Sequence, residues 1–168
     1  MNAQLLSRLR WFGLVVLLVL VDYVTKRLAI HHLANESVKV IPFFSLTYAC
    51  NSGAAFSLFK EFGSLLTWFS VAASILFVVL IYRVPYHRFW LGLAFTGILA
   101  GAVGNLIDRA FRGCVIDFLH FYVGDMSFPI FNFADTLITL GAITWLLAHF
   151  LHKEEATADP DTNESETE

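Results

Sequence analysis

Two aspartates in this sequence stand in surroundings that suit the two halves of acid–base catalysis. Asp117 lies in the run CVIDFLHF as a lone carboxylate among apolar residues, and such desolvation raises the pKa of an acid and favours its neutral form. Asp135 lies in FNFADT at the start of an apolar run, where a helix dipole stabilises an anion in the first turn. Carboxylates in such unlike environments are typical of a pair that activates water and protonates a scissile amide.

Further polar residues lie inside stretches that are otherwise apolar. Asp22 and Lys26 are four residues apart on one helical face, with the acid on the N-terminal side, which is the better orientation for an ion pair. Asn105, Asp108 and Arg109, in GNLIDR, also share one helical face. Charged side chains at membrane depth cost several kcal/mol and usually mark function, so both groups are candidates for a functional role.

Each of these groups also has a structural interpretation that involves no chemistry. Asp22 and Lys26 suit an ion pair at a helix exit, with the lysine reaching the membrane surface, and the GNLIDR residues suit a similar exit cluster. Asn132 suits the N-cap of a helix in which Asp135 is the third residue. Close helix packing alone accounts for the glycines of the same stretch, Gly97, Gly101 and Gly104.

The segment NSGAAFS, residues 51–57, combines an amide with small residues. Asn51 and Gly53 suit close approach of the backbone to another strand or to a ligand, although a turn without function has the same composition. Cys50 and Cys114 are expected to be small buried residues; they could pair if both face an oxidising compartment, but nothing in the sequence requires it. The histidines lack metal-ligand spacing, so no metal site is predicted.

The composition indicates that these residues are embedded in a membrane. Of the 168 residues, 57% are hydrophobic and only 15% are charged, and the mean hydropathy is +0.66. Soluble domains are roughly 45–50% apolar and about 25% charged. This composition excludes a disordered chain, a nucleic-acid binder and an ordinary soluble enzyme. Half of the 14 acidic residues follow Lys153, so residues 154–168 are expected to be a disordered acidic cytoplasmic tail.

The apolar runs predict four membrane spans, since a spanning helix needs roughly 20 mostly apolar residues. They cover about residues 9–29, 64–82, 89–108 and 134–151. The first reaches spanning length only if Asp22 and Lys26 lie inside it or at its exit. A cleaved signal peptide is the alternative for this segment, but charged and bulky residues stand where a small-residue cleavage site is needed. Residues 1–153 are thus one membrane-embedded domain.

Four spans place both termini on one side of the membrane. Arg83 and Arg88 lie in a loop of about six residues, and basic residues in short loops favour the cytoplasm, so the termini are expected there. The other side holds residues 31–63 and 110–131. Residues 38–48 favour short strands interrupted by Pro42, and residues 54–62 suit a short amphipathic helix at the lipid surface.

Five sequence blocks, taken in order, resemble the lipoprotein signal peptidases (signal peptidase II), the bacterial enzymes that process prolipoproteins. The resemblance covers roughly residues 8–152, without the acidic tail. The blocks are DYVTK at 22–26, NSGAAFS at 51–57, GNLIDR at 104–109, VIDF at 115–118 and FNFAD at 131–135.

The resemblance implies a fold and a set of site residues. The fold is that of an all-α membrane protein, a four-transmembrane-helix bundle with a small periplasmic β-platform. Asp117 and Asp135 fall on the family's catalytic aspartates. The supporting and substrate-binding positions are Asp22, Lys26, Asn51, Gly53, Asn105, Asp108, Arg109 and Asn132.

The resemblance also implies an aspartic endopeptidase of the bacterial inner membrane, with its site near the periplasmic face. The substrate is a prolipoprotein whose lipobox cysteine carries diacylglycerol, and the cut falls just before that cysteine. The cyclic peptide globomycin is the expected inhibitor, and no metal or organic cofactor is implied. Membrane lipid is a partner, nucleic acid is not, and the expected state is a monomer because one chain holds the whole site.

Two rival interpretations make different demands on the acidic residues. A small proton-coupled transporter requires acids spread through the membrane depth, whereas here they gather at one face. A non-catalytic membrane scaffold would tolerate asparagine at both Asp117 and Asp135, and it gives no reason for the polar cluster.

Overall fold

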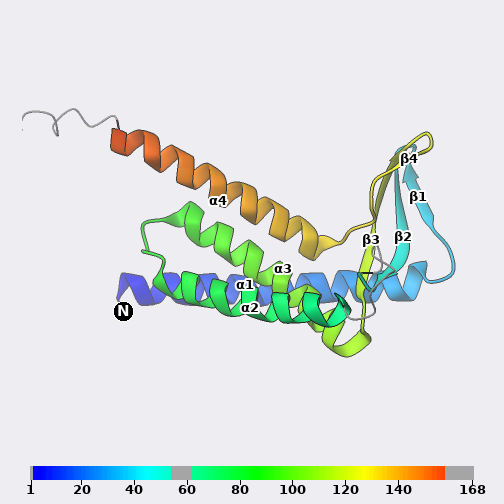
Figure 1. The fold of residues 1–168 in the computed structure, drawn as a ribbon, viewed down its shortest axis with the longest axis horizontal. Coiled ribbons are helices and arrows are strands. Elements are labelled where there is room, and N and C mark those ends of the chain that lie inside the picture. Colours follow the sequence, from blue (N-terminus) through cyan, green and yellow to red (C-terminus); the bar gives the residue numbers. More distant parts are fainter. Residues whose placement is uncertain (1, 54–61, 158–168) are drawn as a thin grey trace, which may run out of the picture.

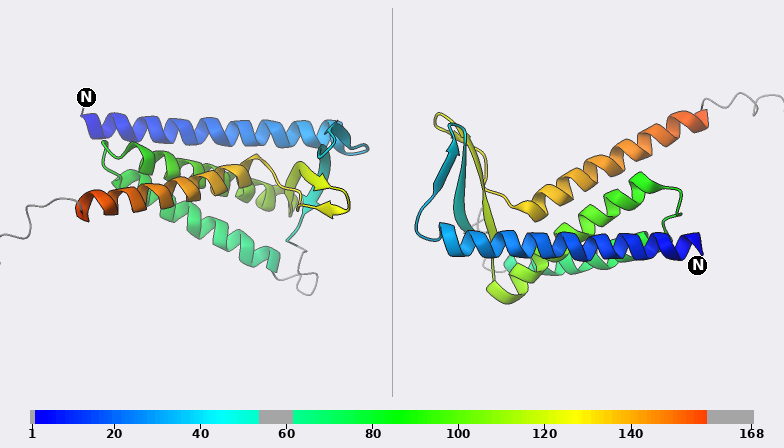
Figure 2. Two further views of the ribbon diagram at one scale, coloured as in Figure 1. Left: turned by 90° about the horizontal axis from the view of Figure 1, so that it is seen from above. Right: turned by 180° about the vertical axis from the view of Figure 1, so that it is seen from behind.

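The computed structural model describes residues 2–53 and 62–157, which form a helical bundle with a small sheet across one end (Figure 1). The helices are α1 (Ala3–Leu33), α2 (Phe62–Arg83), α3 (Phe89–Arg112) and α4 (Phe133–Thr157). The strands are β1 (Val38–Ile41), β2 (Phe44–Asn51), β3 (Val115–Val123) and β4 (Met126–Ser127). Figure 2 shows that the N-terminus and the C-terminal end of α4 lie at the same end of the bundle, opposite the sheet.

Within the described part of the chain, three helices are long and apolar enough to cross a membrane. They are Leu65–Arg83, Phe89–Arg112 and Phe133–Phe150. Many large apolar side chains on the bundle are exposed, such as Trp68 and Phe69 on α2, as expected for surfaces that face lipid. The chain is therefore mostly helical, with an additional sheet.

Helix α3 is the centre of the bundle and packs against α1, α2 and α4. Its Phe95 and Leu99 lie in a core with Ile81 of α2 and Trp11 of α1. The expected close approach at the glycines is present: a Cβ added at Gly101 would overlap the carbonyl oxygen of residue 134 in α4. The α4 backbone therefore lies directly on α3, as small residues permit in membrane bundles.

The sheet has the strand order β1-β2-β3-β4, and every pair is antiparallel. Strands β1 and β2 confirm the prediction for residues 38–48, with the expected interruption at Pro42. Strand β3 is a difference from the expectation, because the four-span topology predicts only that residues 110–131 lie on the outer side. An isolated hairpin is marginally stable in water, and β3 supplies the third strand that a stable sheet needs.

Two further predictions concern the acidic tail at residues 154–168 and the amphipathic helix at residues 54–62. Helix α4 continues to Thr157, so residues 154–157 are helical rather than the start of a disordered tail. Glu and Ala are good helix formers, and no proline interrupts the sequence before Pro160. Residues 158–168 of the predicted tail and residues 54–61 of the predicted amphipathic helix lie outside the described residues.

The two cysteines form a disulfide between the end of β2 and the residue that precedes β3, with Cα atoms 5.5 Å apart. Cys114 is buried, as predicted, but Cys50 is exposed. The prediction of a buried residue is wrong for Cys50 because it lies near the open end of β2, one residue before Asn51.

Candidate active site

Asp117 lies in β3 and is almost fully buried, with 2% of its surface exposed. Both of its carboxylate oxygens accept hydrogen bonds from asparagine amides. Oδ1 accepts from Nδ2 of Asn132 at 2.6 Å, and Oδ2 accepts from Nδ2 of Asn51 at 3.0 Å. Strand β3 thus presents this carboxylate to residues from β2 and from the start of α4.

Asp135 lies in the first turn of α4, where it takes part in a reciprocal helix cap. Its backbone N–H donates to Oδ1 of Asn132 at 2.9 Å, and its Oδ2 accepts from the backbone N–H of Asn132 at 3.2 Å. The structural interpretation of this pair is therefore correct, since each side chain satisfies a backbone donor of the other. The same asparagine contacts Asp117, so the cap also brings the two carboxylates together.

Asn105 of α3 is the second link between the polar groups. Its Nδ2 donates to Oδ1 of Asp135 at 2.8 Å, while its Oδ1 accepts from Nζ of Lys26 at 2.9 Å and from Nδ2 of Asn132 at 3.2 Å. The lysine ammonium can only donate, so the amide oxygen must face it and the amide nitrogen must face Asp135. The lysine therefore fixes which end of Asn105 meets the carboxylate.

Lys26 is the centre of a buried ionic cluster, which we call the lysine cluster and which consists of Asp22, Lys26 and Asp108. Each of the three residues is only 1% exposed. Lys26 Nζ lies 2.8 Å from Oδ2 of Asp22 and 3.1 Å from Oδ2 of Asp108. The interpretation of Asp22 and Lys26 as an ion pair that reaches the membrane surface is therefore wrong, because the lysine points into the bundle.

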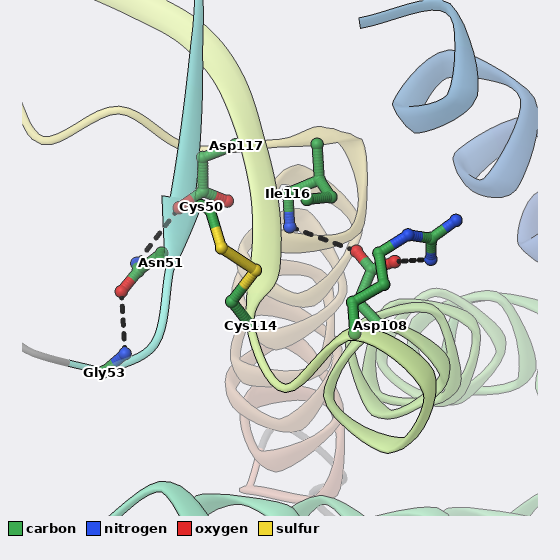
Figure 3. The surroundings of a disulfide bond; sticks show 8 residues. Cys50, Asn51, Gly53, Asp108, Cys114, Ile116 and Asp117 are labelled. Atoms are coloured by element: carbon green, nitrogen blue, oxygen red, sulfur yellow. Dashed lines mark hydrogen bonds and ion pairs between the residues drawn. A yellow bond between two sulfur atoms is a disulfide. The ribbon is translucent and has the colours of Figure 1, made fainter. Parts of the chain in front are cut away.

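The lysine cluster holds the backbone just before each candidate catalytic residue. Asp22 Oδ1 accepts from the backbone N–H of Ala134 at 3.0 Å, one residue before Asp135. Asp108 Oδ2 accepts from the backbone N–H of Ile116 at 3.1 Å, one residue before Asp117 (Figure 3). Burial of charge is costly, and here each carboxylate offsets that cost with an ion pair and a backbone hydrogen bond.

Arg109 of α3 lies next to this network on the side of α2. Its Nη1 donates to the hydroxyl of Ser70 at 3.2 Å, and its charge interacts with Asp135 and Asp117. Arg109 and Asp135 line one end of a cavity of about 430 Å³ between α2, α3 and α4. The other lining residues are mostly apolar, among them Leu66, Phe77, Ile98 and Trp145.

Ser70 is a site residue that the sequence did not reveal. It is a buried serine in the second apolar run, and its hydroxyl also donates to the carbonyl oxygen of Leu66 at 2.9 Å. Serine in a helix commonly bonds its own backbone in this way, so its residue type carried no signal of a role.

Asn51 and Gly53 form the predicted turn at the end of β2. Asn51 Oδ1 accepts from the backbone N–H of Gly53 at 3.0 Å, and Gly53 has a φ of +81°, a conformation that favours glycine. The turn leaves Nδ2 of Asn51 directed at Asp117 (Figure 3). Asn51 thus both closes a turn and contacts the candidate site, just as Asn132 both caps α4 and contacts Asp117.

Burial raises the pKa of Asp117 above its ordinary value, because the ionised carboxylate loses water. The amides of Asn51 and Asn132 act in the opposite direction, since they donate hydrogen bonds to the charged form. Among the charged neighbours, Asp135 raises this pKa further, while Lys26 lowers it. The net effect is a raised pKa, which shifts Asp117 toward its neutral form in the direction that the apolar sequence around it predicts.

Comparisons with known proteins find one and the same family over nearly the whole chain. Residues 14–151 match the family described as signal peptidase (SPase) II. The chain is 43% identical to the lipoprotein signal peptidase of Photorhabdus laumondii over 163 residues, which cover 94% of this chain and 98% of the relative. It is 44% identical to the lipoprotein signal peptidase of Yersinia enterocolitica over 155 residues, which cover 89% of this chain and 92% of that protein.

The fold is also similar to that of a solved structure, which is described as a bacterial membrane enzyme determined by the in meso method at 1.9 Å resolution. The two share 30% identity with a TM-score of 0.76, over 83% of this chain and 92% of the other. On the family match and these identities, the chain belongs to the signal peptidase II family.

Proposed function

We propose that the chain is an aspartic endopeptidase that removes the signal peptide from diacylglyceryl-modified prolipoproteins, cutting just before the lipidated cysteine. The observation that carries this proposal is that one residue, Asn132, bonds both aspartates: its Nδ2 donates to the Asp117 carboxylate, and its backbone N–H donates to the Asp135 carboxylate. Family membership supports the reaction and leaves the transporter interpretation without support.

The unequal burial of the two carboxylates suggests which one acts as the general acid and which one as the general base. Asp117 is buried and its pKa is raised by that burial, which suits the residue that supplies a proton. Asp135 is half-buried and lines the cavity, so it can meet a water molecule there. In this scheme Asp135 takes a proton from water as the oxygen attacks the scissile carbonyl carbon. Asp117 then protonates the leaving nitrogen as the C–N bond breaks.

The cavity suits a lipidated substrate. Its mostly apolar lining lies among three helices that face lipid, and its polar residues gather at the end that holds Asp135. An apolar signal peptide and its acyl chains would contact the apolar part, while Arg109 would hold a carbonyl or ester oxygen at the polar end.

Helix α1 is the fourth span in this proposal. Its charged residues Asp22 and Lys26 point into the bundle, so they do not meet lipid. Its outer face carries exposed apolar side chains such as Leu17, Leu20 and Val24. A helix of 31 residues is also long enough to cross the hydrocarbon core, which requires roughly 20 residues.

The disulfide supports the orientation with the sheet in the periplasm. Disulfides persist in oxidising compartments such as the bacterial periplasm and are rare in the cytosol. The Cys50–Cys114 bond lies at the sheet, whereas both described ends of the chain lie at the other end of the bundle. We therefore infer an inner-membrane protein with cytoplasmic termini. A monomer suffices, since every group of the described network comes from one chain.

The activity is tested with the full-length protein in detergent, without any ion gradient. We expect cleavage of a synthetic peptide whose lipobox cysteine carries diacylglycerol, with the cysteine becoming the new N-terminus by mass spectrometry. The same peptide without lipid should be a poor substrate, and globomycin should block the reaction. Absence of cleavage, combined with proton movement in sealed vesicles, would favour a transporter instead.

The hydrogen bond from Ser70 predicts a role for this serine in holding Arg109. Ser70→Ala removes the acceptor of the guanidinium, so we expect KM to rise by about three- to tenfold while kcat changes little. Ser70→Thr, which keeps a hydroxyl, should restore KM. The matched control is Ser74→Ala, one turn later on α2, whose hydroxyl donates to the carbonyl oxygen of Ser70. Equal effects of the two alanine variants would contradict this role.

The raised pKa of Asp117 predicts a specific pH dependence of kcat/KM. The acid must be protonated to act, so activity should fall as pH rises through its raised pKa. Asn51→Ala removes a donor that favours the ionised form, so the pKa should rise further and this alkaline limb should move to higher pH. The other charged groups that act on Asp117, namely Asp135, Lys26 and Arg109, are unchanged in this variant. A shift to lower pH would contradict Asp117 as the proton donor.

A further inference from the structure

The disulfide is close in the chain to both partners of one hydrogen bond at the candidate site. Cys50 directly precedes Asn51, and Cys114 lies three residues before Asp117. Figure 3 shows the bond joining the end of β2 to the beginning of β3, beside the contact between Asn51 and Asp117. The covalent link and this hydrogen bond therefore connect the same two chain segments.

The bond closes the end of the β2–β3 ladder. The last paired positions are Cys50 with Ile116 and Asn51 with Val115, and the chain then turns at Gly53. The ends of strands open more readily than their centres because fewer contacts hold them. Asn51 is itself exposed, so its own burial contributes little to keeping its amide on Asp117.

The two sides of this contact are held very differently. On the β3 side, Cys114 and Ile116 are buried, and the backbone N–H of Ile116 is bound by Asp108. Asn132, the other amide partner of Asp117, is fully buried and fixed by the cap of α4. Asn51, by contrast, is held by the turn in which its side chain accepts from Gly53 and by the last paired position of β2. The disulfide ties this exposed end to the fixed side.

We propose that the Cys50–Cys114 disulfide is a positioning element of the peptidase, which holds Asn51 against Asp117 and makes full activity dependent on the oxidised state. This inference rests on the proposed function. Formation of the bond removes two protons and two electrons from the thiols, and a thiol oxidant of the disulfide class accepts them. Reduction by a dithiol reverses this exchange.

The first test compares the oxidised and reduced states of the full-length protein in detergent. Dithiothreitol should lower kcat on the order of tenfold with KM little changed, because one hydrogen bond to the reacting carboxyl is lost. It should also move the alkaline limb of the pH profile to higher pH, as Asn51→Ala does. Reoxidation with oxidised glutathione should restore both values. This comparison needs no substitution, so it does not depend on how a variant folds.

The second test uses the double variant Cys50→Ser with Cys114→Ser. It should have the kcat and pH profile of the reduced wild type, and dithiothreitol should not change them, since the chain has only these two cysteines. In Asn51→Ala, whose contact is already lost, reduction should have little additional effect on kcat. These non-additive effects distinguish positioning of Asn51 from a general loss of stability.

The outcomes separate the two proposals. If the oxidised wild type does not cleave the diacylated peptide, the proposed function fails. If it cleaves the peptide, and reduction lowers only the melting temperature while kcat and the pH profile stay unchanged, the disulfide is purely structural and this inference is overturned. Equal losses of kcat on reduction of the wild type and of Asn51→Ala would also overturn it.

Discussion

Replacing either Asp117 or Asp135 with asparagine is expected to reduce cleavage of a diacylated peptide by at least about 10³-fold, because each variant loses a proton-transfer group. Asparagine has nearly the same shape as aspartate but cannot exchange the proton. It also places an amide NH₂ where one carboxylate oxygen now accepts from Asn51, Asn105 or the backbone of Asn132. The measurement is the initial rate with purified protein, at equal amounts of folded enzyme.

The control for this prediction is Asp125→Asn, the same change at an exposed acid between β3 and β4. It should cleave at the wild-type rate. Both site variants should still insert into the membrane, since the groups of the lysine cluster are unchanged. Near-normal maturation of a lipoprotein by either single variant would show that the two carboxylates are not the catalytic pair.

Lys26→Met is expected to destabilise the fold by about 3–5 kcal/mol, because it leaves two buried carboxylates without their shared cation. Asp22 and Asp108 would then repel each other in a site where each is only 1% exposed. Thermal unfolding in detergent should show a large drop in melting temperature. Cleavage should be lost as well, because Asn105 loses the donor that orients its amide toward Asp135.

Two further variants show whether unpaired charge causes this loss. Arg112→Met removes the more exposed partner of Asp108 and should cost no more than about 1 kcal/mol. Adding Asp22→Asn and Asp108→Asn to Lys26→Met removes the repulsion and should recover part of the stability. A melting temperature that Lys26→Met leaves unchanged would mean that the cluster does not hold the bundle together.

The polar residues of the site could be predicted from the sequence because charge is costly among apolar residues, wherever the chain folds. Spacing within one helix also placed Asp22 with Lys26, and Asn132 with Asp135, as the structure has them. Contacts between segments that are distant in the chain could not be predicted, because neither residue type nor spacing indicates which segments meet. Nothing in the sequence shows that Asn105 reaches Asp135, or that Ala134 donates to Asp22.

The missed elements are those whose state depends on a partner elsewhere in the chain. Strand β3 forms because β2 is there to pair with it, although VIDFLHFYV is rich in the aromatic and β-branched residues that strands favour. Ser70 gained its contact only when α2 was placed beside α3. The cysteines pair because β2 and β3 bring residues 64 positions apart within bonding distance.

The hydrogen bond from Ala134 to Asp22 has a consequence for biogenesis. Asp22, Lys26 and Asp108 all precede α4 in the chain, so their ionic contacts require only the earlier segments, whereas Asp135 is made and inserted last. Helix α4 therefore packs onto a lysine cluster that the preceding segments can already form, and the backbone N–H of Ala134 then donates to Asp22. On the proposed assignment of Asp117 and Asp135 as the catalytic pair, the chain lacks one of these two acids until α4 is inserted, so we expect it to have no peptidase activity before that step.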